Sequence, residues 1–283
     1  MTTKTLEQPG SNSQVSPTST TQLAQLHIHS DSDIAADVRR VLQANTLLRA
    51  TADRIDVRVS DGGVTLRGYV ASDAHKARAE NDARQIPGVQ QIENHLIADP
   101  DLEARVAQQI AQDTHVPGES IFVHSTIGVI YLDGQADRAA VADTVERCAA
   151  SVSNVRSVVN RIQFPGVANH KAAPVLLPGI GQAVYASDGW LGRVEQVVMN
   201  PRNRRVTAIV VSANFYSRDS KRERRILIPS TAVRNVNASG IELNFTVDEV
   251  DQSADFDPTK FVAADSHWQP PFDYAPSDIL LSA

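Results

Sequence analysis

The sequence predicts an α+β protein in which two small domains of α-β-β-α-β order stand in tandem and a small all-β barrel follows them. Three observations support this fold class. One stretch of the first half is written twice, with the same spacing of glycines and apolar residues. Each copy contains both helical and strand periodicity, whereas the second half shows strand periodicity alone. A mixed pattern inside a repeated unit predicts duplicated α+β domains, and strands without helices predict a barrel or sandwich.

The repeat runs without a gap from residue 55 to residue 97. The segment "SDGGVTLRGYV" recurs as "TIGVIYLDGQA", so that Gly62 and Gly68 correspond to Gly128 and Gly134. Further identical pairs keep the same offset: Ile55 and Ile121, Val57 and Val123, Leu66 and Leu132, Glu80 and Glu146, Asn94 and Asn160. Self-similarity of this length predicts a duplicated domain, with residues 31–98 as the first copy and 99–164 as the second.

Periodicity assigns the elements of each copy. Ser30 and Asp33 form a capping pair before the first helix. Apolar residues at helical spacing predict the buried stripes Ile34, Val38, Val41 and Leu42 in copy one, and Leu102, Val106 and Ile110 in copy two. Alternating apolar residues at 55–59 and 64–70 predict a β-hairpin. A second helix, with the stripe Val141, Val145, Cys148, Ala149 and Val152 in copy two, precedes a last strand.

Four glycines are expected to be structural in this repeat. Gly62 and Gly128 belong to the hairpin turns. Gly68 and Gly134 fall in the returning strand, where the alternation requires an inward-facing side chain. A glycine at such a place lets another element approach the backbone closely, and a helix packed on the sheet is the expected neighbour.

This pattern resembles the BON family. The resemblance rests on the capped amphipathic helix, the strand I-x-V-x-V, the segment G-x-V-x-L-x-G-x-V, the Ala-rich helix and the motif I-P-G-V-x-x-I-x-N-x-L. Copy one matches it well, and copy two matches it more weakly, with Asn154 in the place of Gly88. The resemblance implies small binding modules, which in many relatives form a pair carried in the bacterial envelope and tied to phospholipid surfaces or to stress. One class of relatives couples such a domain to potassium binding.

The second half resembles the PRC-barrel family over residues 179–250. The matching positions are Gly181, Val184, Asp188, Gly189, Gly192, Val194, Ile228 and Pro229. The resemblance implies a docking module of the kind found in ribosome-maturation factors and in a photosynthetic reaction-centre subunit. Gly189 and Gly192 are further candidate structural glycines, and residues 165–178 form a linker rich in Pro, Gly and Ala. Residues 31–164 and residues 179–250 are each expected to fold alone.

Both ends of the chain are predicted to be tails. Residues 1–30 are rich in Ser, Thr, Gln and Pro, and are predicted to be disordered. Residues 251–283 are rich in Asp, Pro and aromatic residues, and are predicted to be a flexible acidic tail. The N-terminus shows no basic region followed by an apolar stretch, so no signal peptide is visible and no transmembrane segment is expected. A cytoplasmic protein, free or peripheral at a membrane, is the expectation.

Composition limits the chemistry. The net charge of −6 argues against a dedicated nucleic-acid binder. The lone Cys148 excludes an intrachain disulfide and a Cys-based zinc site, and is expected to be a small core residue. His27 and His29 have no third ligand nearby, and Asp31 and Asp33 are interpreted as helix-start residues. No catalytic constellation, metal site or cofactor motif is found, so the expectation is a protein that is not an enzyme, with no cofactor.

Charge is concentrated near the C-terminal end. Residues 193–234 contain ten Arg or Lys and three acids, whereas residues 248–283 contain eight acids and one Lys. The candidate anion-docking residues are Arg202, Arg204, Arg205, Arg218, Lys221, Arg222, Arg224 and Arg225. A basic segment of this density can hold phosphates of lipid or RNA, and the alternative is a solvated loop masked by the acidic tail.

The predicted function is that of a non-enzymatic adaptor. It would dock partner proteins or an anionic phospholipid surface through its BON-like and barrel modules, in connection with stress. Two alternatives stay open: sensing of a cation such as potassium by a BON-like domain, and binding of RNA or of an assembling ribosome by the basic barrel. Fold resemblance supports all three, because fold alone does not determine function.

Overall fold

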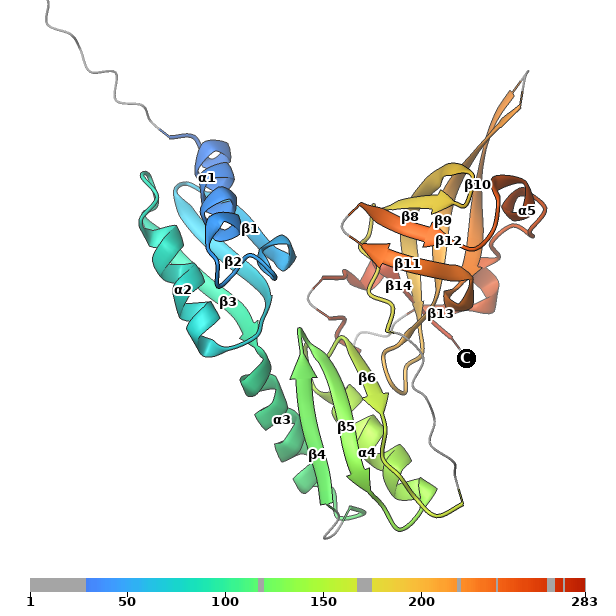
Figure 1. Ribbon diagram of the computed structural model, residues 1–283, viewed down its shortest axis with the longest axis horizontal. Helices are drawn as coiled ribbons and strands as arrows, with labels where there is room; N and C mark the ends of the chain where they lie inside the picture. Colours follow the sequence, from blue (N-terminus) through green and yellow to red (C-terminus); the bar gives the residue numbers. More distant parts are fainter. Residues whose placement is uncertain are drawn as a thin grey trace, which may run out of the picture.

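The computed structural model describes residues 29–116, 120–166, 175–217, 220–237, 239–263, 268–271 and 273–282, with the side chains of 216–222 outside the description. It consists of three lobes (Figure 1), in which the second domain lies between the first domain and a β-rich third domain. The predicted N-terminal tail lies almost entirely outside the described residues. The α+β class and the order of the domains are confirmed.

The first domain has the predicted α-β-β-α-β order. Its elements are α1 (Asp31–Ala44), β1 (Ile55–Ser60), β2 (Gly63–Val70), α2 (Asp73–Arg84) and β3 (Gln91–Ala98). The sheet order is β1-β2-β3, with an antiparallel hairpin followed by a parallel pair. Ser30 and Asp33 form the predicted capping box, and Ile34, Val38 and Leu42 are buried against the sheet.

The second domain repeats this architecture. Its elements are α3 (Asp99–Ala111), β4 (Ser120–Thr126), β5 (Val129–Gln135), α4 (Ala139–Ser151) and β6 (Ser157–Asn160). The sheet order is β4-β5-β6 with the same directions. The predicted stripes of α3 and α4 form the core, and Cys148 is buried among them as expected. Since α3 begins at the residue after the end of β3, no linker separates the two domains.

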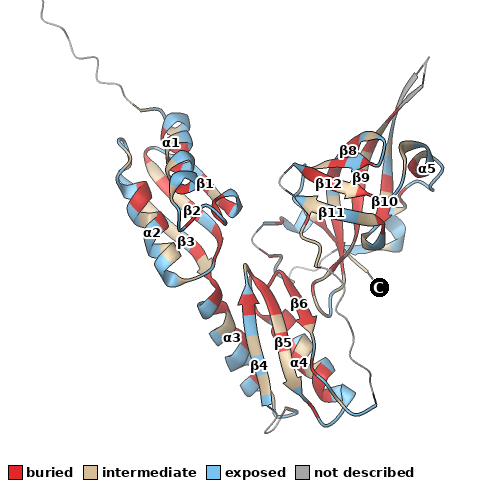
Figure 2. Ribbon diagram, viewed as in Figure 1, coloured by how far each residue is buried: buried red, intermediate tan, exposed pale blue. Residues whose placement is uncertain are grey.

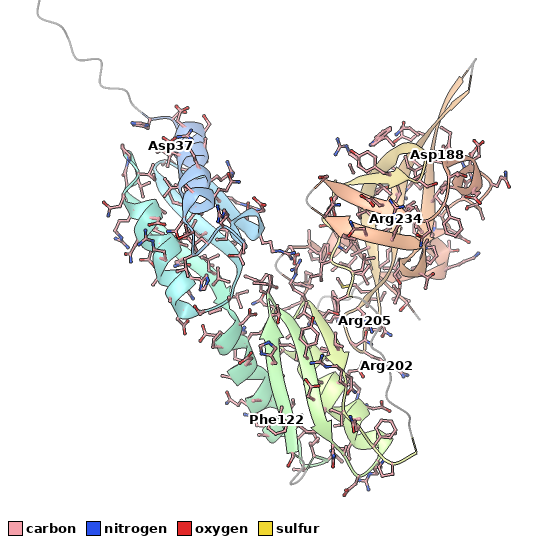
Figure 3. All side chains as sticks on the ribbon, in the orientation of Figure 1. Asp37, Phe122, Asp188, Arg202, Arg205 and Arg234 are labelled. Atoms are coloured by element: carbon pink, nitrogen blue, oxygen red, sulfur yellow. The ribbon has the colours of Figure 1, made fainter. Side chains whose placement is uncertain are left out.

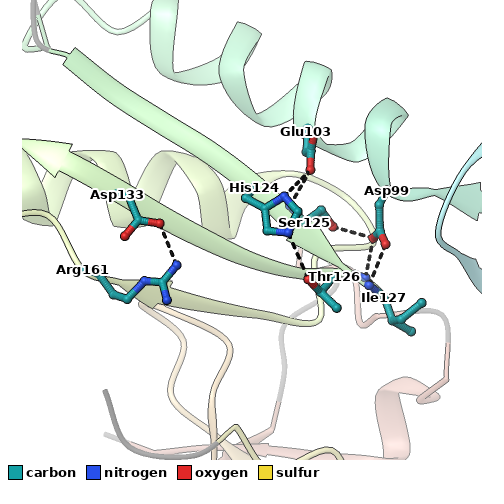
Figure 4. Close-up of polar contacts among 9 residues, drawn as sticks. Asp99, Glu103, His124, Ser125, Thr126, Ile127, Asp133 and Arg161 are labelled. Atoms are coloured by element: carbon teal, nitrogen blue, oxygen red, sulfur yellow. Dashed lines mark hydrogen bonds and ion pairs between the residues drawn. The ribbon is translucent and has the colours of Figure 1, made fainter. Parts of the chain in front are cut away.

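Each hairpin is held by an aspartate at the start of the first helix. Both turn residues have positive φ, namely Asp61 at 50° with Gly62 at 72°, and Ile127 at 50° with Gly128 at 79°. Asp99 accepts hydrogen bonds from the backbone N–H groups of Ile127 (2.8 Å) and Gly128 (3.0 Å), as Figure 4 shows in part. Asp31 does the same for the first turn, at 2.8 and 2.9 Å. The helix-start interpretation of Asp31 is confirmed, and its hold on the hairpin is an additional role.

A second duplicated network ties the last strand to the second helix. The amide of Asn94 donates to the Lys76 carbonyl and the Glu80 carboxylate, each at 3.1 Å. Asn160 makes the same contacts with Ala142 and Glu146, also at 3.1 Å. The identical Glu and Asn pairs of the repeat therefore have a common cause, because each amide is satisfied inside its own domain.

The close-approach role of Gly68 and Gly134 holds, but the neighbour differs from the expected one. A Cβ on Gly68 would overlap the carbonyl oxygen of Arg54, and a Cβ on Gly134 that of Ser120. The backbone that approaches is thus that at the start of the partner strand, not a helix packed on the sheet, because Arg54 immediately precedes β1 and Ser120 is the first residue of β4. Both glycines also have φ near 137°, which side chains disfavour.

The third domain is built on one sheet of order β10-β9-β8-β7-β12-β11. Its strands are β7 (Ala183–Ala186), β8 (Gly189–Met199), β9 (Val206–Ser217), β10 (Ser220–Pro229), β11 (Val233–Asn237), β12 (Gly240–Leu243), β13 (Val262–Ala263) and β14 (Ile279–Leu281), with a short helix α5 (Val247–Asp251). Figure 2 shows the buried positions concentrated on these strands. Gly192 lies where a Cβ would overlap the backbone of Ser212, whereas Gly189 faces open space, so only Gly192 is a packing glycine.

The C-terminal region is not the flexible tail that composition suggested. Strand β14 pairs in parallel with β8, and Tyr274 and Ile279 belong to the core of the third domain. The Tyr274 hydroxyl donates to the carbonyl of Pro178 at 2.5 Å in a buried setting. The prediction was wrong because it gave too much weight to the acidic residues. Burial of the aromatic and aliphatic side chains of this region stabilises its packing on the third domain.

Candidate binding surfaces

Two of the predicted docking arginines are already paired with acids of the same domain. Arg224 donates to Asp255 at 2.6 Å and to Asp251 at 2.7 Å, and its side chain is only 14% exposed. These hydrogen bonds, the one to Asp255 first, raise the pKa of its guanidinium. Arg225 donates to Glu195 at 2.8 Å and to Gln196 at 2.7 Å. Neither residue presents an uncompensated charge to a ligand.

Arg204 is buried and holds the second and third domains together. It donates to the carbonyl of Val155 at 3.0 Å, and its guanidinium lies 5.0 Å from the centre of the Trp268 ring. Burial lowers its pKa to about 10. A side chain in this place cannot belong to an exposed docking surface, so this part of the candidate site is corrected.

The other candidates do not form one face with these residues. Arg202 is exposed and Arg205 is half-buried, and both lie at the end of the third domain that faces the second (Figure 3). Arg218 lies outside the described residues, as do the side chains of Lys221 and Arg222. The alternation of β10 further sends Arg224 and Arg225 to opposite faces of the sheet. The sequence correctly located the positively charged residues along the chain, but it did not show that their side chains lie on different parts of the fold.

The domain junction joins all three domains around residues 153–158. The backbone N–H of Val158 donates to the Asn203 carbonyl at 2.8 Å, which covers the free edge of β6. Arg156 forms an ion pair with Asp273 of the C-terminal segment, and its guanidinium lies 5.2 Å from the centre of the Tyr69 ring. The Tyr69 hydroxyl, from the first domain, donates to the Asn154 carbonyl at 2.8 Å. The three domains are therefore connected by directed polar contacts.

The second domain leaves the outer face of its sheet open. Phe122 on β4 is 68% exposed and lies away from the other two domains (Figure 3). On the neighbouring positions, His124 faces Tyr131 with ring centres 6.4 Å apart, and Arg161 stacks 4.8 Å from the Tyr131 ring. Arg161 also pairs with Asp133 at 2.6 Å, and His124 with Glu103 at 3.1 Å (Figure 4). We call Phe122, His124, Tyr131, Asp133 and Arg161 the open face.

Sequence reasoning missed the open face, although the repeat contains the signal for it. In the register of the repeat, Phe122 corresponds to Asp56 and Tyr131 to Thr65. The first domain thus has a charged residue, paired with Arg58 at 2.7 Å, where the second exposes an aromatic ring. Positions that are identical in the two copies indicate what the fold requires. Exposed positions that differ indicate where the surfaces of the two domains differ.

Models of two families match this chain. The BON domain model matches residues 30–100 and 98–166, and the PRC-barrel domain model matches residues 180–250. The chain carries two BON domains followed by a PRC-barrel domain. Tandem BON domains and a PRC-barrel are modules of the binding type, as the family resemblance of the sequence implied.

Individual relatives cover part of the chain. Osmotically-inducible protein Y of Escherichia coli (strain K12) is 28% identical over an alignment of 146 residues, and the match covers 47% of this chain and 72% of the relative. Two solved structures of CdsD, a structural protein of the type III secretion system of Chlamydia trachomatis, match 48% of this chain, with TM-scores of 0.41 and 0.38 and identities of 17% and 14%. The chain spans 63% and 66% of these two structures, less than two thirds of their length.

Metal-binding side chains do not cluster among the described residues. Among them, no group of three or more His, Cys, Asp or Glu side chains is placed to hold a metal ion. The Asp31 carboxylate, near the loop considered for cation binding, is occupied by two backbone N–H groups of the turn. Within the same residues, no helix has the length and apolar content that crossing a membrane requires.

Proposed function

We propose that this protein is a non-enzymatic adaptor, which presents the open face of its second BON domain to a protein partner. The observation that carries the proposal is Phe122, a large aromatic side chain 68% exposed on β4, the edge strand of the second domain's sheet. Exposed aromatic anchors flanked by Arg are typical of protein interfaces, where they contribute most of the binding free energy. The balanced charges of Asp133 and Arg161 beside it fit a protein surface better than a strongly anionic one.

The scaffold supports this role. Helices α3 and α4 pack on the inner face of the sheet, so that Phe122 and Tyr131 stand on a preformed surface that needs no ordering upon binding. The junction contacts of Arg204 and Arg156 hold the PRC-barrel at a defined place beside this sheet. A partner docked on the open face and a ligand of the barrel are thereby carried on one molecule in a defined arrangement, which is what an adaptor does.

A role in stress is part of the proposal. The support is the likeness to a relative whose name describes osmotic induction. We expect the amount of this protein to rise when its source cells are moved to high osmolarity. Quantitative immunoblotting before and after the shift measures this, and an unchanged amount would contradict the stress assignment while leaving the binding role in place.

Docking to an anionic surface is a second, weaker candidate. It would depend on Arg218, Lys221 and Arg222, whose side chains lie outside the described part of the chain, since Arg224 and Arg225 are engaged by acids. Phospholipid or RNA would be bound there without sequence or headgroup specificity, and with strong salt dependence.

The test of the adaptor role uses matched surface variants. Phe122→Ser removes the proposed anchor, and Val262→Ser, at a position 62% exposed on the barrel domain, is the control. Proteins retained by the whole chain and by both variants are compared by quantitative mass spectrometry. We expect at least one partner whose recovery falls about tenfold or more with Phe122→Ser, the effect of a single strong anchor, and is unchanged with the control. Identical sets of proteins on all three baits would refute the proposal.

A further inference from the structure

A pocket of about 550 Å³ opens at the domain junction, and none of its lining residues belongs to the open face. Three segments form its wall: the end of α4, the turn between β8 and β9, and the C-terminal segment at Trp268 and Gln269. The lining residues are Arg147, Ala150, Ser151, Ser153, Pro201, Arg202, Arg204, Trp268 and Gln269. The volume lies in the range of about 300–1,000 Å³ that is usual for sites of small ligands.

The wall of this pocket is cationic. Among the described residues that line it are three arginines and no carboxylate. Arg202 is exposed and forms no ion pair with any described residue, and the Arg147 guanidinium donates to the hydroxyl of Thr144 at 2.9 Å. The end of α4 brings partial negative charge of about half a unit, which the full charges of three guanidinium groups exceed.

Arg204 makes the imbalance costly. Its side chain is buried, its recorded partners are the Val155 carbonyl and the Trp268 ring, and its Nε has no hydrogen-bond partner among the described residues. A buried cation without a counter-charge destabilises a fold, and a nearby anion offsets that cost. Desolvation of the buried guanidinium also lowers the pKa of Arg204.

We propose that this pocket binds a small organic phosphate, with Arg147 and Arg202 on the phosphate group. The charged wall supplies the counter-ions for the oxygens, and Gln269 adds an exposed amide. The apolar part of the lining, Ala150, Pro201 and the Trp268 ring, matches a ligand with a compact body better than a bare ion. The site and its ligand are distinct from the open face and the protein partner, so this proposal stands or falls separately from the proposed function.

Ligand binding at this place acts on the domain arrangement. The wall exists only while the BON pair, the β8–β9 turn and the C-terminal segment are docked, because each provides part of it. By mass action, a ligand that binds the docked form stabilises that form. A small phosphate compound would therefore strengthen the junction of the BON pair with the PRC-barrel.

The experiment uses the whole chain and calorimetric titration with AMP, inorganic phosphate and adenosine as probes. We expect AMP to bind, inorganic phosphate to compete with it, and adenosine, which lacks the phosphate, to give no signal. Arg147→Gln and Arg202→Gln should each weaken AMP binding about tenfold or more, the loss typical of one charged hydrogen bond. Arg138→Gln, at the opposite end of α4 and outside the pocket wall, is the matched control and should bind as the parent does.

Three outcomes would overturn the proposal. One is the absence of binding by AMP and by inorganic phosphate at about 10 mM, beyond the range of a weak specific site. Another is AMP binding that both pocket variants leave unchanged. The third is binding to vesicles containing phosphatidylglycerol, lost in the two variants, without any binding of AMP, since this would assign the arginines to a membrane surface. Far-ultraviolet circular dichroism and the melting temperature without ligand verify that the variants fold.

Discussion

At the scale of single residues, the structure shows why both copies of the repeat have glycine at the same position. Gly68 and Gly134 occupy the same position, with the same φ and the same overlap between an added Cβ and the partner strand. The hairpins can close at this spacing only if the position has no side chain. The same reasoning distinguishes two glycines of the third domain. A Cβ added to Gly192 would overlap backbone atoms, whereas a Cβ added to Gly189 would face open space.

Replacement of either repeat glycine should destabilise its domain. Gly68→Val and Gly134→Val each force a backbone displacement and a disfavoured φ, at a cost of about 2–3 kcal/mol. Denaturant unfolding measures the change in the free energy of unfolding. Gly189→Ala is the control and should change it by less than about 1 kcal/mol. A Gly68→Val variant as stable as the parent would contradict the close-approach role.

Cys148 should be inert in the folded protein. Burial raises the pKa of its thiol, and Asp113, whose carboxylate lies 3.5 Å from Sγ, adds to the shift. A raised pKa leaves less thiolate at pH 8, and the thiolate is the reacting species. We expect slow labelling by a thiol reagent in the native state and immediate labelling after denaturation. Equal rates in the two states would show that the thiol is accessible.

At the scale of elements, the hairpin turn differs between the copies in one informative way. Both turns require positive φ at two residues. The first meets this with Asp61 and Gly62, whereas the second places Ile127, a β-branched residue, at φ 50°. Residues of that kind rarely adopt this conformation. The Asp99 cradle holds the strained turn through its bonds to Ile127 and Gly128.

Relief of this strain should stabilise the second domain. Ile127→Asn replaces the β-branched side chain with one that tolerates positive φ, and should raise the free energy of unfolding by about 1 kcal/mol. The reciprocal change in the first domain, Asp61→Ile, should lower it by a similar amount. Thermal melts of both variants measure the shifts. A lower melting temperature for Ile127→Asn would show that the side chain of Ile127 contributes packing that exceeds the strain.

At the scale of the whole molecule, the boundaries of the autonomous parts need revision. Each BON domain has its own hydrophobic core. The core of the third domain, however, draws Tyr274 and Ile279 from beyond residue 250. The cooperative unit therefore includes the C-terminal segment, which the composition of residues 251–283 had suggested was a spacer.

This arrangement predicts how pieces of the chain behave. Residues 30–166 and residues 175–283 should each show a cooperative thermal transition alone. Residues 179–250 lack β14 and Tyr274, and should melt at a clearly lower temperature than 175–283, or without cooperativity. The comparison is made by circular dichroism. If 179–250 were as stable as the longer piece, the C-terminal segment would be packed on the barrel without supporting it.

The charge pattern predicts self-masking of the basic strand. Asp251 and Asp255 hold Arg224 through three short hydrogen bonds, counting one to the backbone of Asp251. The double variant Asp251→Asn, Asp255→Asn frees that guanidinium and should strengthen binding to anionic vesicles, most clearly at low salt, where screening is weak. Adding Arg224→Ser should remove the gain. Vesicle sedimentation at two salt concentrations measures both. An Asn double variant that binds no better than the parent would refute the masking role.

Much of the architecture could be predicted from residue patterns. Helix stripes such as Ile34, Val38 and Leu42 and the alternating strands depend on local periodicity, which each element carries within itself. The constant offset shared by many pairs between residues 55 and 97, Asn94 and Asn160 among them, was sufficient to indicate two copies. The hold of Asp31 on the turn at Gly62 was not predictable, since it joins residues far apart in sequence.

For the candidate binding residues, too, some properties could be predicted from the sequence and others could not. The sequence by itself determined the duplicated α+β units, the β-rich third domain, the structural glycines of the repeat and the concentration of positive charge near the C-terminal end. Only the tertiary structure decided which charges are available: Arg204 is buried at a junction, Arg224 is bonded to acids, and Arg202 and Arg147 meet at one pocket. The physical reason is that backbone periodicity is a local property, whereas the burial and pairing of a charge depend on which distant segments fold against it.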